Sequence, residues 1–310
     1  MSISLKHRIE YGTLRSIIFI INLLPVPVIL GFSGLLGRLA WIIYPFRLDV
    51  AYKNLSTILP GQPKKDRMGI LRRTYIQFAQ TFGLIFILHR KKMMEQIANA
   101  EISGLDKVEK ALAQGKGAIL TTYHGCWFEA YFAWFNKTNL PTTLIYQKQS
   151  NPLSNQYFVR QRTRYGNALH HLDSASGMKA YEEALAKNHL LIVSLDQRYS
   201  AKGTDVLFFD TPLKCAKGTA VLHMRTKAPV LTSVYYMKNG KLHIDFDSVD
   251  LPDYTEISED AIQDLTTRAI SKYEMHIRNY PEQWFSLFHK LWTKKGYDKV
   301  SRNFRDLIFS

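Results

Sequence analysis

Cysteine is scarce in this sequence, with two residues among 310. So few thiols exclude a disulfide framework and indicate a reducing compartment. The thiol of Cys126 lies inside a motif described below, and we interpret it as a small buried group rather than a nucleophile. Four further candidates for metal binding have no second ligand at a zinc-like spacing, so we expect no metal site: His170, His171, His223 and His289.

Signals for nucleotides and nucleic acids are also missing. The segment Gly115-Lys116-Gly117 lacks the upstream glycine and the Ser or Thr of a phosphate-binding loop, so it predicts a tight turn before a strand. The sequence has no zinc-finger spacing, no RNP-like aromatic motif and no basic repeat. We therefore expect no cofactor and no nucleic-acid partner.

Acidic residues are few relative to basic ones, 26 against 41, which gives a formal net charge of +15. An excess of this size implies an anionic partner. Because Lys and Arg are scattered among membrane-like apolar stretches, an anionic lipid surface or an acidic protein fits better than nucleic acid. The length of 310 residues suits one domain of about 200–250 residues plus an extension.

The longest segment without charge runs from Ser16 to Gly37. As one helix it would be about 33 Å long, enough to cross a hydrocarbon core of about 30 Å. Pro25 and Pro27 argue against a single straight helix. A kinked membrane span and a shallow membrane hairpin both remain open, and a buried hairpin of a soluble protein is the alternative.

Basic residues precede this segment at Lys6, Arg8 and Arg15, which favours a cytoplasmic N-terminus. No small-x-small cleavage site follows, which argues against a cleaved signal peptide. We divide the chain into a membrane-anchoring helical segment (1–45), a helical region that packs on the next domain (46–100) and an α/β domain (101–310).

Hydrophobic periodicity predicts one or two amphipathic helices over residues 64–92. From Glu101 onward predicted strands and helices alternate, which indicates an α/β sandwich around a mostly parallel sheet. The predicted strands are 118–122, 142–146, 190–195, 230–236 and 242–246. The predicted helices are 105–114, 128–135, 154–164, 177–187, 217–226 and 259–278.

The hexapeptide His124–Glu129 is the most informative motif, because it joins a predicted buried strand to a predicted helix. On one regular helix the two residues would point about 140° apart, so they can meet only with His124 on the loop and Glu129 in the first turn. A carboxylate would then fix the imidazole tautomer and leave the other nitrogen as a general base. With helix N-terminal amides beside it to hold an oxyanion, this arrangement fits acyl transfer to a hydroxyl. Alternatively, His124 is a strand-end residue bonded to backbone.

This spacing resembles the His-x4-Asp/Glu motif of glycerolipid acyltransferases. The rest of the chain resembles one branch, the bacterial lipid A late acyltransferases and their mannoside-acylating relatives. Blocks similar to those of that branch occur in the same order over nearly the whole chain: Arg162–Gly166, Leu191–Gln197, Asp205–Phe209, Gly218–Ala220, Thr226–Val230 and the closing strand Tyr280–Phe285.

Two departures from the branch are evident. Its usual His-x-Gly-Asn-Trp-Glu is replaced here by a motif with Gly125 directly after His124 and no asparagine. Near the end, Ser286 and Phe288 stand where an aromatic residue and a His are common. The chain therefore resembles a divergent member of the branch, and we expect that its acceptor can differ from lipid A.

The resemblance implies a glycerolipid-acyltransferase-like αβα sandwich with an N-terminal membrane-associated segment. It also implies a membrane-bound O-acyltransferase on the cytoplasmic face of the bacterial inner membrane. The donor would be an acyl-carrier protein or acyl-CoA, and the acceptor a hydroxyl of an anionic glycolipid. A lipid carrier without catalysis and a thioesterase-like hydrolase are the alternatives.

In this interpretation His124 takes the proton of the hydroxyl. Glu129 is the preferred partner of His124, and Asp196 at the end of another strand competes for that role. Arg162 would bind a phosphate or steady the oxyanion, unless it belongs to an Arg-rich helix face. The resemblance adds substrate contacts from Gly125, Gln197, Gly218 and Thr219.

Overall fold

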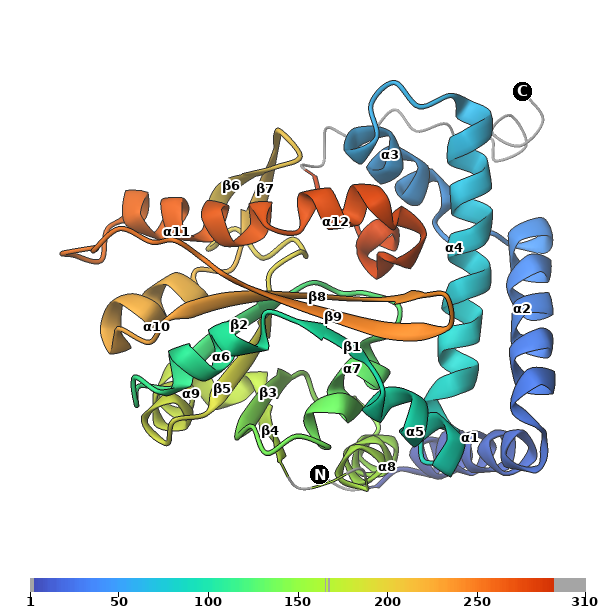
Figure 1. Ribbon diagram of the computed structural model, residues 1–310. Coiled ribbons are helices and arrows are strands. Elements are labelled where there is room, and N and C mark those ends of the chain that lie inside the picture. Colours follow the sequence, from blue (N-terminus) through green and yellow to red (C-terminus); the bar gives the residue numbers. More distant parts are fainter. Residues whose placement is uncertain (1–2, 165, 167, 293–310) are drawn as a thin grey trace.

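A seven-stranded sheet lies at the centre of the computed structural model, which describes residues 3–164, 166 and 168–292 (Figure 1). The strand order is β1-β9-β8-β2-β5-β3-β4, and every neighbouring pair is parallel except β8 and β9. The mostly parallel sheet predicted from the sequence is thus confirmed. The strands are β1 (Glu101–Ser103), β2 (Ala118–Thr122), β3 (Thr142–Tyr146), β4 (Leu169–Asp173), β5 (Leu190–Ser194), β8 (Val230–Lys238) and β9 (Lys241–Ser248).

Strand β2 is central, and all five of its residues are buried. It carries no charged residue, and the hydroxyls of its two threonines donate to the carbonyls of Leu231 and Ser233, as suits a strand that helices cover on both faces. Ile119 pairs with Leu191 of β5 on one side and with Val230 of β8 on the other. Strands β2, β3 and β5 run in the same direction, so their carboxyl ends meet at one edge of the sheet. Ligand sites of open α/β sheets form at that edge.

Helices lie on both sides of the β8–β9 pair (Figure 1). On one side are α11 and α12, and on the other are α6 and α7. The helices of this part are α6 (Leu105–Leu112), α7 (Phe128–Phe135), α8 (Pro152–Thr163), α9 (Gly177–Ala186), α10 (Gly218–Thr226), α11 (Glu259–Ser271) and α12 (Glu274–Asn279).

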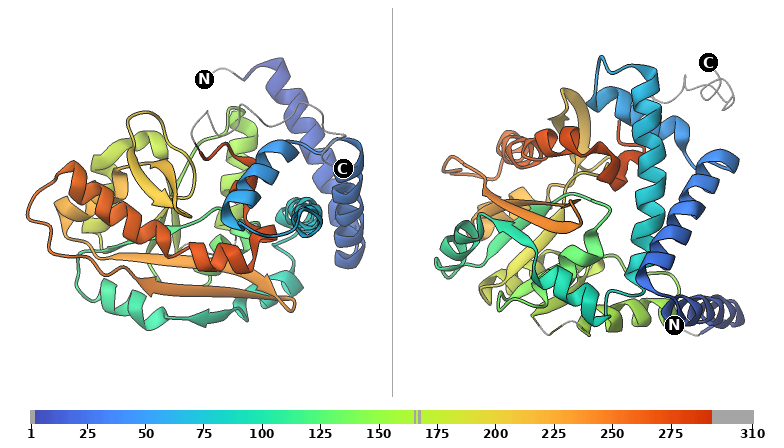
Figure 2. Two further views of the ribbon diagram at one scale, coloured as in Figure 1. Left: turned by 90° about the horizontal axis from the view of Figure 1, so that it is seen from above. Right: turned by 45° about the vertical axis from the view of Figure 1, so that its right-hand side comes forward.

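Two helices occupy the N-terminus, α1 (Leu5–Leu23) and α2 (Val26–Ile43). They run crosswise to each other (Figures 1 and 2) and join at Leu24-Pro25, where the proline ends the helical hydrogen bonding as expected. Arg90 holds the junction by donating hydrogen bonds of 2.7–3.1 Å to the carbonyls of Ile21, Asn22 and Leu24. The Ile21 carbonyl also accepts the Leu24 N–H at 3.1 Å, and a guanidinium is favourable at this C-terminal end of the helix.

Helix α2 is long and apolar enough to cross a membrane, judged by its length and composition alone. One of its faces packs against α4 (Lys64–Ile85) through small residues. A Cβ added to Gly37 would lie 2.7 Å from the Ile76 Cα, and one added to Gly83 would lie 2.3 Å from the Ser33 Oγ. The remaining surface of the two N-terminal helices exposes large apolar side chains: Ile9, Ile17, Phe19, Ile20, Leu23, Val28, Phe32, Leu35, Leu36, Leu39, Ile42 and Ile43.

Helix α3 (Leu48–Ile58), helix α4 and helix α5 (Lys91–Ala98) connect the N-terminal pair to the sheet. Helix α4 thus accounts for most of the predicted helical region 64–92, and α5 begins only at its end. Buried residues from Ile29 to Trp292 form one hydrophobic cluster, so this region shares the core of the α/β part.

Several expectations need correction. The predicted helix 259–278 is two helices, α11 and α12, and the sequence analysis missed β1, β4 and the hairpin β6–β7 (Thr204–Phe208 and Thr211–Cys215). The closing strand at 280–285 is two 3₁₀ turns, Pro281–Gln283 and Phe285–Phe288. Pro281 has no N–H for a ladder, and Trp284 forms an isolated bridge with Gly125. The end of the predicted 101–310 domain and Tyr165 lie outside the described residues.

Candidate active site

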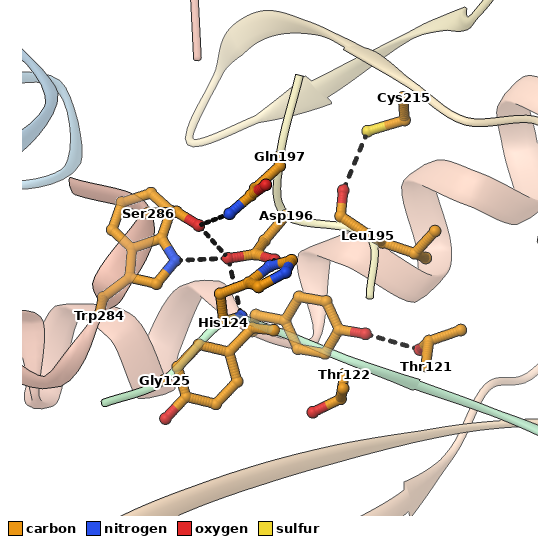
Figure 3. A network of polar contacts seen from close by, with 12 residues as sticks. Thr121, Thr122, His124, Gly125, Leu195, Asp196, Gln197, Cys215, Trp284 and Ser286 are labelled. Atoms are coloured by element: carbon orange, nitrogen blue, oxygen red, sulfur yellow. Dashed lines mark hydrogen bonds and ion pairs between the residues drawn. The ribbon is translucent and has the colours of Figure 1, made fainter. Parts of the chain in front are cut away.

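His124 and Asp196 meet at the carboxyl edge of the sheet (Figure 3). His124 follows β2 and Asp196 follows the neighbouring parallel strand β5, so the register of the two strands brings the loops together. The Nδ1 atom of His124 lies 2.6 Å from Asp196 Oδ1, and the backbone N–H of His124 donates to Asp196 Oδ2 at 3.0 Å. With Asp196 ionised, Nδ1 carries the proton, and Nε2 is the nitrogen left to act as a base.

Asp196 is fully buried and accepts two more hydrogen bonds, both from the segment after α12. The indole N–H of Trp284 and the hydroxyl of Ser286 each donate to Oδ2 at 2.8 Å. The carboxylate therefore receives four donors in all, which satisfies its acceptors and fixes its orientation. The Gln197 side chain contacts Ser286, with Nε2 3.4 Å from the Ser286 Oγ.

The pKa values of the pair shift in opposite directions. Burial alone would lower the pKa of His124, but the charge and hydrogen bond of Asp196 outweigh it and raise that pKa above its usual value. Burial alone would raise the pKa of Asp196, but His124 and the other donors hold it below the usual range. The carboxylate thus stays ionised and increases the basicity of the imidazole.

Glu129 does not contact His124 among the described interactions, which corrects the preferred assignment from the sequence. Its carboxylate forms an ion pair with Arg162 of α8, in which Arg162 Nε donates to Oε2 at 3.0 Å and an Nη atom donates to Oε1. Both side chains are largely buried, at 9% and 15% exposure. Glu129 lies in the first turn of α7 as predicted, but the helix directs it toward α8 rather than toward the loop that carries His124.

A cavity of about 340 Å³ opens beside His124. Pockets of this size typically accept small-molecule ligands. Its wall is mostly apolar and comes from the end of α4, from α7, α8 and from the ends of β3 and β5. His124, Glu129 and Arg162 lie on its rim or wall with Phe82, Ile85, Phe128, Phe132, Leu144, Ile145, Phe158 and Val159. The arrangement places one basic nitrogen and one guanidinium next to space for an apolar chain.

A profile of the family described as bacterial lipid A biosynthesis acyltransferase matches residues 2–294. The chain belongs to this family. It is 26% identical over 293 residues to the lipid A biosynthesis acyltransferase of Haemophilus influenzae, covering 92% of this chain and 89% of that protein. It is 22% identical over 242 residues to the phosphatidylinositol mannoside acyltransferase of Mycobacterium tuberculosis H37Rv, covering 76% of this chain and 74% of that protein.

Not every residue that the resemblance assigned to substrate binding lines the cavity of this acyltransferase. The backbone N–H of Gly125 is buried and lies 3.0 Å from the Tyr235 hydroxyl, so it is not free for an oxyanion. A Cβ there would lie 2.8 Å from Tyr235 Cε2, which explains the glycine by close approach. Gly218 and Thr219 occupy the first turn of α10 and do not line the cavity.

The Cys126 thiol is 1% exposed, and burial raises its pKa to about 12. A thiol with this pKa stays protonated at neutral pH, which agrees with the interpretation of a small buried group. Among residues 3–164, 166 and 168–292, no group of three or more His, Cys, Asp and Glu side chains is placed to hold a metal.

The sequence analysis missed the role of Trp284 and Ser286. Trp284 belongs to a block that resembles the family, and Ser286 was noted only as a departure from it. Helix α3 holds this segment: Asn54 Nδ2 donates to the carbonyls of Leu287 and His289 at 2.8 and 2.7 Å. Asn54 precedes this segment by more than 230 residues in the sequence. It thus helps to hold the segment whose side chains donate to the Asp196 carboxylate.

Proposed function

We propose that this acyltransferase is an O-acyltransferase that moves a fatty acyl chain from a thioester donor to a hydroxyl of a lipid acceptor. The observation that carries the proposal is the His124–Asp196 pair, with Nδ1 engaged at 2.6 Å, at the edge of a mostly apolar cavity. A fixed imidazole with one nitrogen engaged by a buried carboxylate is the arrangement of a general base.

In the proposed reaction, His124 Nε2 removes the proton from the acceptor hydroxyl while the oxygen attacks the thioester carbonyl carbon. The tetrahedral intermediate then collapses, the carbon–sulfur bond breaks, and the imidazolium returns the proton to the departing thiolate. Asp196 stabilises the imidazolium while it exists. General base catalysis of this kind typically contributes about 10²–10⁴-fold to the rate.

The negative charge that develops on the thioester carbonyl oxygen requires hydrogen-bond donors that stabilise it. The first-turn amides of α7 have no partners within the helix, and Phe128 and Glu129 of that turn line the cavity. Arg162 lines the same cavity, and its ion pair with Glu129 holds the guanidinium in one orientation. We assign oxyanion or phosphate binding to Arg162 and positioning of Arg162 to Glu129.

The apolar wall formed by α4, α7 and α8 would hold the acyl chain of the donor. The donor is an acyl-carrier protein or acyl-CoA, both of which are anionic, and the net charge of +15 favours either one. The acceptor is an anionic glycolipid, such as a lipid A precursor or a related lipid, as the names of the relatives suggest.

We further propose that residues 1–45 attach the protein to the cytoplasmic face of the bacterial inner membrane. The exposed apolar side chains of α1 and α2 support this, and so do the basic residues Lys6, Arg8 and Arg15 near the N-terminus. Residues 46–100 connect this segment to the catalytic part that begins near Glu101.

The test uses a donor labelled in its acyl group, incubated with the full chain and a crude bacterial lipid extract. Labelled lipid is the expected product. Free labelled fatty acid would identify a hydrolase, and unchanged donor would identify a carrier without catalysis. Either result would overturn the proposed transfer.

A further inference from the structure

A second cavity, of about 300 Å³, lies on another side of α8, between this helix, α1 and the turn that precedes α5. Its wall contains two arginines, Arg15 of α1 and Arg164 at the end of α8, together with His89, whose pKa is lowered by burial and by the neighbouring arginines. No Asp or Glu belongs to the described lining. It shares no lining residue with the cavity beside His124.

The two arginines have no carboxylate partner among the described interactions. The Arg15 guanidinium carbon lies 5.4 Å from the centre of the Tyr157 ring, and Arg164 Nη1 lies 3.3 Å from Gln161 Oε1. Each guanidinium is thus supported by a neutral group and keeps donors for an anion.

The Tyr157 side chain forms part of this wall and carries a hydroxyl group. Tyr157 is 7% exposed, and its hydroxyl has no hydrogen-bond partner within the described part of the chain. Burial raises the pKa of Tyr157, although Arg15 and Arg164 oppose the shift, so the hydroxyl stays protonated and can donate.

Apolar surface surrounds the mouth of this cavity. Ile18 and Phe19 line it, and the same helix exposes Ile17, Ile20 and Leu23. An amphipathic helix with this surface lies in the interface of a bilayer, at the depth of the phosphate groups. The positive charge of the two arginines therefore complements the negative phosphate layer of the bilayer that α1 would contact.

We propose that this cavity binds the phosphate of an anionic bilayer phospholipid and thereby seats the enzyme on the membrane. The forks of Arg15 and Arg164 would contact the phosphate oxygens, and the Tyr157 hydroxyl would donate to the same group. This binding goes beyond the acyl-transfer reaction and requires no acyl donor.

The experiment measures how the full chain partitions onto phosphatidylcholine vesicles with and without phosphatidylglycerol, in physiological salt. The site variant is Arg15→Gln with Arg164→Gln. The control variant is Arg8→Gln with Arg160→Gln, which removes the same charge from α1 and α8 at exposed positions outside the cavity. All four arginines are exposed, so both variants should fold, which thermal melting checks.

The site variant should bind phosphatidylglycerol vesicles about tenfold more weakly than the control variant, since it alone loses charge-assisted bonds to phosphate. Equal losses in the two variants would assign the attraction to scattered charge and overturn the proposal. If binding matches the control while the KM for the lipid acceptor rises, the cavity holds the acceptor's own phosphate, and the assignment to a bilayer lipid is wrong.

Discussion

Replacing Asp196 by asparagine separates the two acids that the sequence left as candidates. The buried carboxylate accepts three donors at Oδ2 and one at Oδ1. An amide has one oxygen and one NH₂ group. If the NH₂ group takes the Oδ2 position, it faces three donors, and each unsatisfied buried donor costs about 1–3 kcal/mol. The amide oxygen should therefore take the Oδ2 position.

In that orientation the NH₂ group faces Nδ1 of His124 and donates to it. The ring proton then moves to Nε2, so the nitrogen that faces the substrate can no longer accept a proton. Because each of the four contacts then keeps one donor and one acceptor, Asp196→Asn should still fold. Loss of the correct tautomer in a comparable buried pair lowers the rate by about 10⁴-fold, and we expect a loss of that order in kcat.

The assay is the pH dependence of acyl transfer. Activity rises as His124 loses its proton, so the acidic limb reports its pKa, which Asp196 raises. Asp196→Asn should move that limb to lower pH, because the neutral amide no longer stabilises the imidazolium. Glu129→Gln is the control: it weakens the ion pair with Arg162 and should leave the acidic limb unchanged. A rate for Asp196→Asn within about tenfold of wild type, with no shift of the limb, would refute the reasoning.

Three further predictions concern neighbouring features. Gly125→Ala should lower the stability by about 1–3 kcal/mol through overpacking against Tyr235, whereas Gly218→Ala, whose Cβ meets no atom within 4 Å, should melt within about 2 °C of wild type. Equal melting temperatures would contradict this. Arg90→Gln should increase hydrogen exchange at the end of α1, since three carbonyls lose the hydrogen bond from the guanidinium, and Lys91→Gln should not. Equal protection in both variants would count against the Arg90 contact. Thiol reagents should leave Cys126 unmodified in the native enzyme at neutral pH, as mass spectrometry would detect.

Much of the fold could be predicted because the strands follow local rules. The bounds predicted for 118–122 and 142–146 match β2 and β3, and those for 190–195 and 230–236 lie within two residues of β5 and β8. Buried apolar runs between turns identify such strands. The edge strand β4 (Leu169–Asp173) was missed, because two histidines and an aspartate interrupt its apolar pattern.

The candidate site was only partly predictable. The sequence proposed His124, Glu129, Asp196 and Arg162 as candidates, but proximity in the chain favoured Glu129 as the partner of His124, whereas the structure places Asp196 there. The pairing depends on strand order: β5 lies next to β2, and only the assembled sheet places Asp196 beside the loop. Trp284 and Ser286 contact Asp196 because the chain after α12 comes back to the edge of the sheet. No local sequence pattern predicts this path of the chain.

The division of the N-terminus into two apolar helices was partly predictable as well. The uncharged stretch and the break at Pro25 are local features, and the structure places the break between α1 and α2. The packing of α2 on α4 depends on small residues that are far apart in the sequence, such as Ser33 and Gly83. Their complementarity is visible only when the two helices are side by side.

The central claim is that His124 is the base for acyl transfer to a lipid hydroxyl. The direct measurement is a single-turnover reaction of His124→Ala with a labelled acyl thioester and lipid acceptor, after melting has confirmed the fold. We predict that formation of labelled lipid slows by about 10²–10⁴-fold while the donor still binds. Labelled lipid formed at the wild-type rate by the folded variant would contradict the account.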